Sequence, residues 1–210
     1  GIVMDPNTGE VLGMASYPSY DPLDLRSIAA VPNSEHNLAL AAFEPGSTMK
    51  VFTTAIALDN GVISPSTTYF CSGTMTINNR TLGCAGHGGE THANHGSVGY
   101  DKILIQSCNV GAAYVGLATG MQAEYDGLKK LGLLDPCGLE LRESISQLSP
   151  DALLSPSQKS GKSIKFIDAT QRATVARVAF GQSISVSPIR LARAFCAMVN
   201  GGKLVTPTLI

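Results

Sequence analysis

The chain has 210 residues, of which 44% are hydrophobic and 15% charged, and its formal net charge is −1. This composition is typical of a folded globular domain and excludes a disordered chain. The near-neutral charge gives no electrostatic footprint for nucleic acid, so we expect no nucleic-acid partner. No apolar run approaches the roughly 20 residues of a membrane span, and we find no signal peptide. Because the chain starts without Met and inside a strand-like pattern, we expect it to be a segment of a longer protein.

The N-terminal third predicts a hairpin, a loop and a buried helix. Two short apolar segments in residues 1–18 flank the turn-forming stretch 5–9, which predicts a β-hairpin. Residues 20–37 are polar and predict a loop. Apolar residues then recur at spacings of three and four between Pro45-Gly46 and Asn60-Gly61. This pattern predicts a buried helix over residues 47–59.

Ser47 and Lys50 form the only S-x-x-K sequence in the chain and lie one turn apart at the start of the predicted helix. A serine hydroxyl becomes a good nucleophile when a base removes its proton. Burial disfavours the charged form of lysine, so a buried Lys50 can serve as that base. The free N–H groups at a helix start can also stabilise an oxyanion. The alternative is structural, with Ser47 as a helix cap and Lys50 as a solvated first-turn residue.

Residues 67–86 predict a short β segment with a turn at Asn78-Asn79. One cysteine and three histidines follow within twelve residues: Cys84, His87, His92 and His95. Such clustering raises the possibility of zinc, but the spacing fits no common zinc module. We therefore expect exposed loop histidines and no metal or other cofactor. Cys71 and Cys84 flank the β segment and are candidates for a disulfide in an oxidising compartment.

The second half of the chain predicts further helices. Residues 98–106 and 110–118 each predict a helix, and Ser107-Cys108-Asn109 lies between them as the only S-x-N sequence. On its own, this triplet is explained by a helix cap. Residues 135–170 are the least ordered by composition. Another helix is expected from Pro188 to the stop at 200–202, with Cys196 buried in it, and a strand is expected over 204–210.

Taken together, Ser47-x-x-Lys50 and Ser107-x-Asn109 match two of the motifs that penicillin-binding proteins and class A β-lactamases share. Nearly the whole chain resembles the transpeptidase domain of class B penicillin-binding proteins, and the Cys71/Cys84 pair is similar to versions from clostridia or spore formers. The matching segments are 3–16, 17–22, 44–50, 95–96, 107–109, 181–188, 191–194 and 200–203. The implied fold class is α+β, a penicillin-binding-protein/β-lactamase-like fold with a helical core and an N-terminal β-hairpin.

The resemblance also implies roles for four residues. Ser47 would be the acylated nucleophile, Lys50 its base, Ser107 a proton shuttle and Asn109 a substrate-binding residue. The implied donor is the D-Ala-D-Ala end of a peptidoglycan stem peptide, and β-lactam antibiotics would acylate the same serine. The expected setting is the extracytoplasmic face of the bacterial membrane, reached through an N-terminal anchor outside this chain, with cell-wall synthesis proteins as partners.

The chain departs from the family's pattern at the third motif. The family's third motif, Lys-Thr-Gly or Lys-Ser-Gly on an edge strand, lies beyond the Asn-Gly-Gly helix end. We therefore expect residues 1–210 to be a partial domain without the Lys-Thr-Gly strand and the strands after it, and nearly inactive alone. Lys159-Ser160-Gly161 matches by letters, but it precedes Gly181-Gln182, so its order is wrong and we treat it as coincidental. Alternatives are a β-lactam sensor or silent cell-wall scaffold, and a β-lactamase or D,D-carboxypeptidase relative, although no glutamate matches the class A motif.

Overall fold

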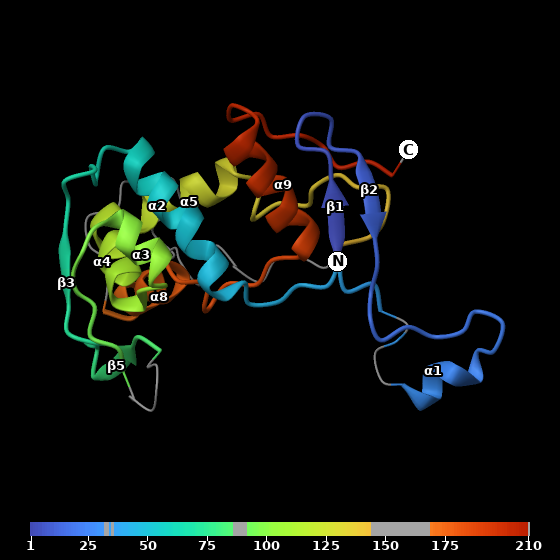
Figure 1. The fold of residues 1–210 in the computed structure, drawn as a ribbon, viewed down its shortest axis with the longest axis horizontal. Helices are drawn as coiled ribbons and strands as arrows, with labels where there is room; N and C mark the ends of the chain where they lie inside the picture. Colours follow the sequence, from blue (N-terminus) through green and yellow to red (C-terminus); the bar gives the residue numbers. More distant parts are fainter. Residues whose placement is uncertain (32–33, 35, 86–91, 144–168, 210) are drawn as a thin grey trace. The chain divides into compact units, whose positions relative to one another are not determined.

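The computed structural model describes residues 1–31, 34, 36–85, 92–143 and 169–209. The chain divides into two compact units, each assembled from segments that are distant in sequence (Figure 1). Unit 1 is formed by residues 1–43, 129–147 and 185–210, and unit 2 by residues 44–128 and 148–184. Within the described ranges, no helix has both the length and the apolar character that a membrane span requires.

Unit 1 is built around the predicted hairpin. Strands β1 (Ile2–Met4) and β2 (Val11–Met14) pair antiparallel, with Ile2 opposite Met14. The carboxylate of Asp5 accepts hydrogen bonds from the backbone N–H groups of Asn7 and Thr8, which closes the turn. Helix α9 (Pro188–Val199) packs against β1 and begins at its proline, as the sequence predicts.

The core of unit 1 joins all three of its segments. Its buried members are Leu40, Cys137, Leu139 and Ile189, and the hairpin residues Ile2, Met4, Val11 and Met14 pack against them. A buried ion pair, Arg190 Nε to Glu143 Oε1 at 2.9 Å, lies in the same unit. The hydroxyl of Ser187 donates to the same carboxylate oxygen at 2.8 Å. The carboxylate is therefore both paired and hydrogen-bonded, as a buried charge must be.

Two expectations for unit 1 are wrong. The strand expected over 204–210 is reduced to an isolated parallel bridge between Glu10 and Thr208, because Pro207 has no N–H to donate to a ladder. The expected loop of residues 20–37 contains a short helix, α1 (Arg26–Ala30). None of its residues is buried, so it has no apolar periodicity from which a helix could be predicted.

Unit 2 is mostly helical. The short 3-10 helix η1 (Gly46–Thr48) leads into α2 (Met49–Asp59), and α3 (Tyr100–Ile105), α4 (Asn109–Thr119), α5 (Met121–Lys130) and α8 (Ala169–Val178) follow. The last two residues of α5 are counted with unit 1. Helix α4 is central and packs against both α2 and α8 (Figure 1). Small residues allow these close approaches, since a Cβ on Gly116 would meet the Cβ of Ala179 at 2.6 Å.

Two antiparallel strand pairs complete unit 2. Strands β4 (Thr74–Ile77) and β5 (Arg80–Gly83) form a hairpin, and β3 (Tyr69–Cys71) pairs with β6 (Gly96–Val98). Asn78 and Asn79 both have left-handed φ values, 51° and 58°, so the predicted turn at this dipeptide is confirmed. The ring of Tyr69 stacks on that of Tyr114 with centroids 5.5 Å apart, which ties β3 to α4.

Candidate active site

The geometry around Ser47 is set by a tight backbone contact. Gly46 and Gly181 both have positive φ, 58° and 81°, and the Gly46 N–H donates to the Gly181 carbonyl at 3.0 Å. A Cβ on Gly181 would collide with the backbone of Gly46, so only glycine fits at this position. The N–H of Ser183 also donates to the carboxylate of Glu44 at 2.8 Å. The chain after α8 thus fixes the segment that presents Ser47.

Ser47 is exposed at the surface, whereas Lys50 lies beneath it with 1% of its surface accessible. The hydroxyl of Ser47 lies 2.8 Å from Nζ of Lys50 and accepts a hydrogen bond from the Ser107 hydroxyl, also at 2.8 Å. Helix α2 begins at Met49, one residue after η1, and no side-chain cap bond is formed by Thr48 at its N-cap. The hydroxyl of Ser47 therefore faces the lysine and the second serine, which argues against the interpretation of Ser47 as a helix cap.

Lys50 is surrounded by oxygen atoms from the other predicted site residues. Its Nζ donates to Oγ and the backbone oxygen of Ser107, both at 2.9 Å, and to Oδ1 of Asn109 at 2.7 Å. Burial lowers the pKa of Lys50 from 10.5 to about 8, against the opposing effect of the nearby thiols of Cys84 and Cys108. A neutral amine is thus accessible at mildly alkaline pH, with its lone pair within reach of the Ser47 hydroxyl.

The loop before α4 holds the other two predicted residues in place. Ser107 has a φ of 52°, which is uncommon for a residue with a side chain and marks local strain. The Asn109 amide donates through Nδ2 to the Gly83 carbonyl at 2.9 Å, while its Oδ1 accepts from Lys50. Because both ends of this amide are engaged by fixed partners, its orientation is defined. The four side chains predicted from the sequence therefore lie together within unit 2.

A cavity of about 320 Å³ opens beside Asn109, between the β4–β5 hairpin and the end of α8. Its walls include Arg80, Gly83, Arg177, Phe180 and Gln182. A mixed lining of this kind, with cationic, amide and aromatic groups, suits a peptide-like ligand. This cavity could not be predicted from the sequence, because its walls come from segments about 100 residues apart.

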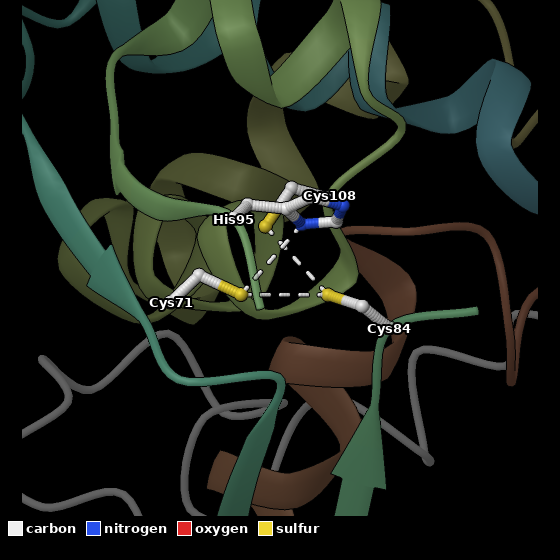
Figure 2. Close-up of side chains that lie close together, drawn as sticks. All are labelled: Cys71, Cys84, His95 and Cys108. Carbon is white, nitrogen blue, oxygen red and sulfur yellow. Dashed lines mark hydrogen bonds between the residues drawn. The ribbon is translucent and has the colours of Figure 1, made fainter. Parts of the chain in front are cut away.

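A second cluster lies deeper in unit 2 and was not predicted. The side chains of Cys71, Cys84, His95 and Cys108 point toward one another (Figure 2), and their potential ligand atoms lie within 4.8 Å of one another. All five cysteines are free thiols, and the Cys71 and Cys84 sulfurs are 3.6 Å apart without a disulfide. Cys108, rather than Ser or Asn, is the N-cap of α4, and its sulfur accepts from the Gly111 N–H at 3.2 Å.

His92 and His95 differ in their exposure to solvent. His92 is exposed, as expected for a loop, whereas His95 is half-buried with Nδ1 3.7 Å from the Cys71 sulfur. The expectation of exposed loop histidines is therefore wrong for His95, because the antiparallel pairing of Cys71 with Gly96 brings the neighbouring histidine to that sulfur. His87 lies outside the described residues, as does Lys159-Ser160-Gly161. The group of one cysteine and three histidines that the sequence suggested did not include Cys71 and Cys108, because these lie 13 and 24 residues away from Cys84.

With this geometry established, comparison with known proteins identifies the family. The family model "Penicillin binding protein transpeptidase domain" matches residues 1–210. The chain belongs to this family. The resemblance found in the sequence is therefore confirmed at the level of the family.

Relatives and solved structures agree with this assignment. The chain is 32% identical over 205 residues to a probable peptidoglycan D,D-transpeptidase FtsI of Caulobacter vibrioides, covering 97% of this chain and 31% of that protein. It is 31% identical over 207 residues to stage V sporulation protein D of Bacillus subtilis, covering 98% and 29% respectively. The chain thus spans about a third of the length of these curated relatives.

Among solved structures, the transpeptidase domain of Burkholderia pseudomallei penicillin-binding protein 3 aligns with a TM-score of 0.74 at 23% identity. That alignment covers 99% of this chain and 52% of the other. A peptidoglycan glycosyltransferase structure from Burkholderia ambifaria aligns with a TM-score of 0.75 at 24% identity, covering 100% and 55%. These likenesses confirm the predicted α+β transpeptidase fold.

Proposed function

We propose that this chain carries the nucleophile and proton-transfer groups of a peptidoglycan D,D-transpeptidase. The observation that carries the proposal is the position of the buried Lys50 amine, 2.8 Å from the exposed Ser47 hydroxyl and 2.9 Å from that of Ser107. A nucleophile within hydrogen-bond reach of its base, with the base held by further groups, is the arrangement that serine acyl transfer requires. The proposed site residues are Ser47, Lys50, Ser107 and Asn109.

In the proposed reaction, neutral Lys50 takes the proton of the Ser47 hydroxyl, and Oγ attacks the carbonyl carbon of the penultimate D-Ala of a stem peptide. The peptide bond to the last D-Ala breaks, leaving an ester on Ser47. The departing amine receives a proton through Ser107, whose hydroxyl bridges Lys50 and Ser47. Attack by the amine of a second stem peptide then restores the serine and forms the cross-link.

Asn109 is proposed to bind the amide of the donor peptide. Its side chain is held between Lys50 and the Gly83 carbonyl and lines the cavity beside β5. A fixed amide offers both a donor and an acceptor to a peptide backbone. β-Lactam antibiotics present a strained amide in place of the D-Ala-D-Ala bond, so the same serine is expected to open the lactam ring and keep the acyl group.

The wider setting is part of the same proposal. Because the substrate is peptidoglycan, we propose that the domain works on the extracytoplasmic side of the cell membrane, held by an anchor outside this chain, alongside other cell-wall synthesis proteins. We further propose that residues 1–210 are part of a domain whose Lys-Thr-Gly strand is supplied by additional chain, and that cross-linking needs this strand for its second oxyanion-binding N–H.

The proposal is tested by acylation with a fluorescent penicillin. A form extended through the Lys-Thr-Gly strand is expected to be labelled with a 1:1 stoichiometry, and Ser47→Ala to be unlabelled. Thr48→Ala is the matched control, since the neighbouring Thr48 hydroxyl donates to the Pro45 carbonyl at 2.7 Å and not to the site. Labelling that persists in Ser47→Ala, or its absence in a folded extended form, refutes the proposed chemistry. Subsequent loss of the label by rapid hydrolysis would assign a β-lactamase-like reaction instead.

A further inference from the structure

We propose that Cys71, Cys84, His95 and Cys108 bind one Zn²⁺ ion in a closed, structural site. The sulfurs of Cys71 and Cys84 are 3.6 Å apart and those of Cys84 and Cys108 3.7 Å apart. Nδ1 of His95 is 3.7 Å from the Cys71 sulfur. A tetrahedral zinc ion with Zn–S bonds of about 2.3 Å needs ligand atoms about 3.8 Å apart. These three ligand-to-ligand distances fit such a site, and all four ligand atoms lie within 4.8 Å of one another (Figure 2).

Each ligand comes from a different element of unit 2. Cys71 ends β3, Cys84 follows β5, His95 precedes β6 and Cys108 caps α4. The strands concerned are only three or four residues long, and such short strands have few hydrogen bonds with which to hold one another. A metal shared by all four segments would fix their relative positions, which is the role of structural zinc in small folds.

The donor set favours zinc over other metals. Three thiolates and one imidazole match the Cys₃His composition of structural zinc sites, and the soft thiolates disfavour Mg²⁺ and Ca²⁺. All four positions of a tetrahedral ion are supplied by the protein, which leaves no open position for a catalytic water. The sulfur-bearing side chains are at most 1% exposed, so the ion would be shielded from solvent.

Backbone groups around the cluster are oriented to stabilise thiolates. The N–H of Val110 donates to the Cys84 sulfur at 3.5 Å, and the N–H of Gly111 donates to the Cys108 sulfur at 3.2 Å. Both N–H groups belong to the first turn of α4, where the helix dipole also favours negative charge. Such N–H···S contacts form the outer shell that orients metal-bound cysteines.

The site adjoins the proposed active-site residues through the backbone. Cys108 is the central residue of Ser107-Cys108-Asn109, and Cys84 directly follows Gly83, whose carbonyl accepts from the Asn109 amide. Zinc would therefore hold the loop that carries Ser107 and Asn109. This positional role rests on the proposed function, whereas metal binding itself does not.

Zinc binding is tested by metal analysis of the chain purified under reducing conditions and supplied with Zn²⁺. We expect one zinc per chain in the wild type and in the control Cys196→Ser, whose buried thiol lies on α9 in unit 1. Cys71→Ser and Cys108→Ser are expected to lose at least four fifths of the bound zinc. A zinc content that is the same in all four proteins, or no zinc in the wild type, overturns the proposal.

Because a ligand variant can fail to fold, two measurements use proteins that keep four ligands. Co²⁺ in the wild type is expected to give the visible absorption of a tetrahedral ion together with thiolate-to-cobalt charge-transfer bands. His95→Cys is expected to retain the metal and strengthen these bands. At a free zinc concentration 1,000-fold above Kd, the melting temperature of the wild type should rise by roughly 10 °C.

An octahedral cobalt spectrum, an unchanged melting temperature, or a Cys71–Cys84 disulfide in the zinc-supplied protein contradicts the site. The two proposals also fail separately. A zinc-loaded extended form that is never acylated by penicillin refutes the proposed function alone. Acylation that is equal before and after complete removal of zinc refutes the positional role while leaving metal binding intact.

Discussion

Gly181 is the position where the structure makes the sharpest prediction about stability. Its φ of 81° disfavours any residue with a Cβ, and that Cβ would also overlap the backbone of Gly46. Gly61 provides a matched control in the same unit, because its φ is 65° and a Cβ there would meet nothing within 4 Å. The two glycines thus share the backbone conformation and differ in the contact.

The expected losses of stability follow from the left-handed backbone conformation and from the contact with Gly46. Placing alanine in a left-handed conformation costs roughly 1–2 kcal/mol, which is the expected destabilisation of Gly61→Ala. Forcing atoms into an occupied space typically adds about 1–3 kcal/mol. The expected total for Gly181→Ala is therefore about 2–5 kcal/mol. Since the displaced Gly46 directly precedes Ser47, the variant should also acylate more slowly with penicillin, whereas Gly61→Ala should not.

The assay is urea unfolding followed by circular dichroism, with linear extrapolation of the unfolding free energy to zero denaturant. Penicillin acylation of the same variants is measured in the form extended through the Lys-Thr-Gly strand. Equal losses of stability in Gly181→Ala and Gly61→Ala would refute the argument, because the Gly46 contact would then contribute nothing. A Gly181→Ala protein that is destabilised as expected but acylates at the wild-type rate would show that the contact does not position Ser47.

Three further predictions concern buried ionisable groups. The acylation rate should rise with pH through about 8, since the neutral amine of Lys50 is the base and burial lowers its pKa to that value. Lys50→Arg should reduce the rate by at least about 100-fold. An acylation rate that stays constant from pH 6 to 9 would argue against Lys50 as the base. Burial raises the pKa of Glu124 from 4.5 to about 7, against the hydrogen bond from Thr53. The folded state therefore holds a proton that the unfolded state releases, so stability should fall by about 3 kcal/mol as pH rises from 4.5 to above 7. Unfolding at pH 5 and 8 should show this loss in the wild type and not in Glu124→Gln, and equal losses would contradict the pKa assignment. Arg190→Met should destabilise unit 1 by about 3–5 kcal/mol, because it leaves Glu143 buried without its cation. Adding Glu143→Gln to this variant should recover part of the lost stability. A double-mutant cycle that shows no coupling energy between Arg190 and Glu143 would exclude the pair as a stabilising unit.

The parts of the fold that could be predicted from sequence are those with a local signal. The hairpin of residues 1–18 has a turn sequence between apolar segments, α2 has an apolar period between two breakers, and α9 has a proline at its start. The missed elements lack such a signal. Helix α1 buries no residue, and β6 is a three-residue strand that depends on pairing with β3.

The candidate site shows the same division between local and long-range information. The S-x-x-K and S-x-N motifs were found because each is unique in the chain, and their combination pointed to penicillin-binding proteins and class A β-lactamases. Nothing local links Gly181 to Gly46 or Gly83 to Asn109, since these contacts join residues 135 and 26 positions apart. The cysteine cluster was obscured for a related reason. Its spacings of 13, 11 and 13 residues match no common zinc module, and only the β3–β6 pairing brings His95 to Cys71.

We propose above that Ser47 forms an acyl-enzyme with Lys50 as its base. The most direct measurement is intact mass, followed by peptide mapping, after incubation with a labelled penicillin, on residues 1–210 and on the form extended through the Lys-Thr-Gly strand. We expect one adduct per extended chain, located on Ser47 and absent from Ser47→Ala, with at most weak labelling of residues 1–210. An adduct on another residue, or a folded extended form that stays unmodified, would contradict it.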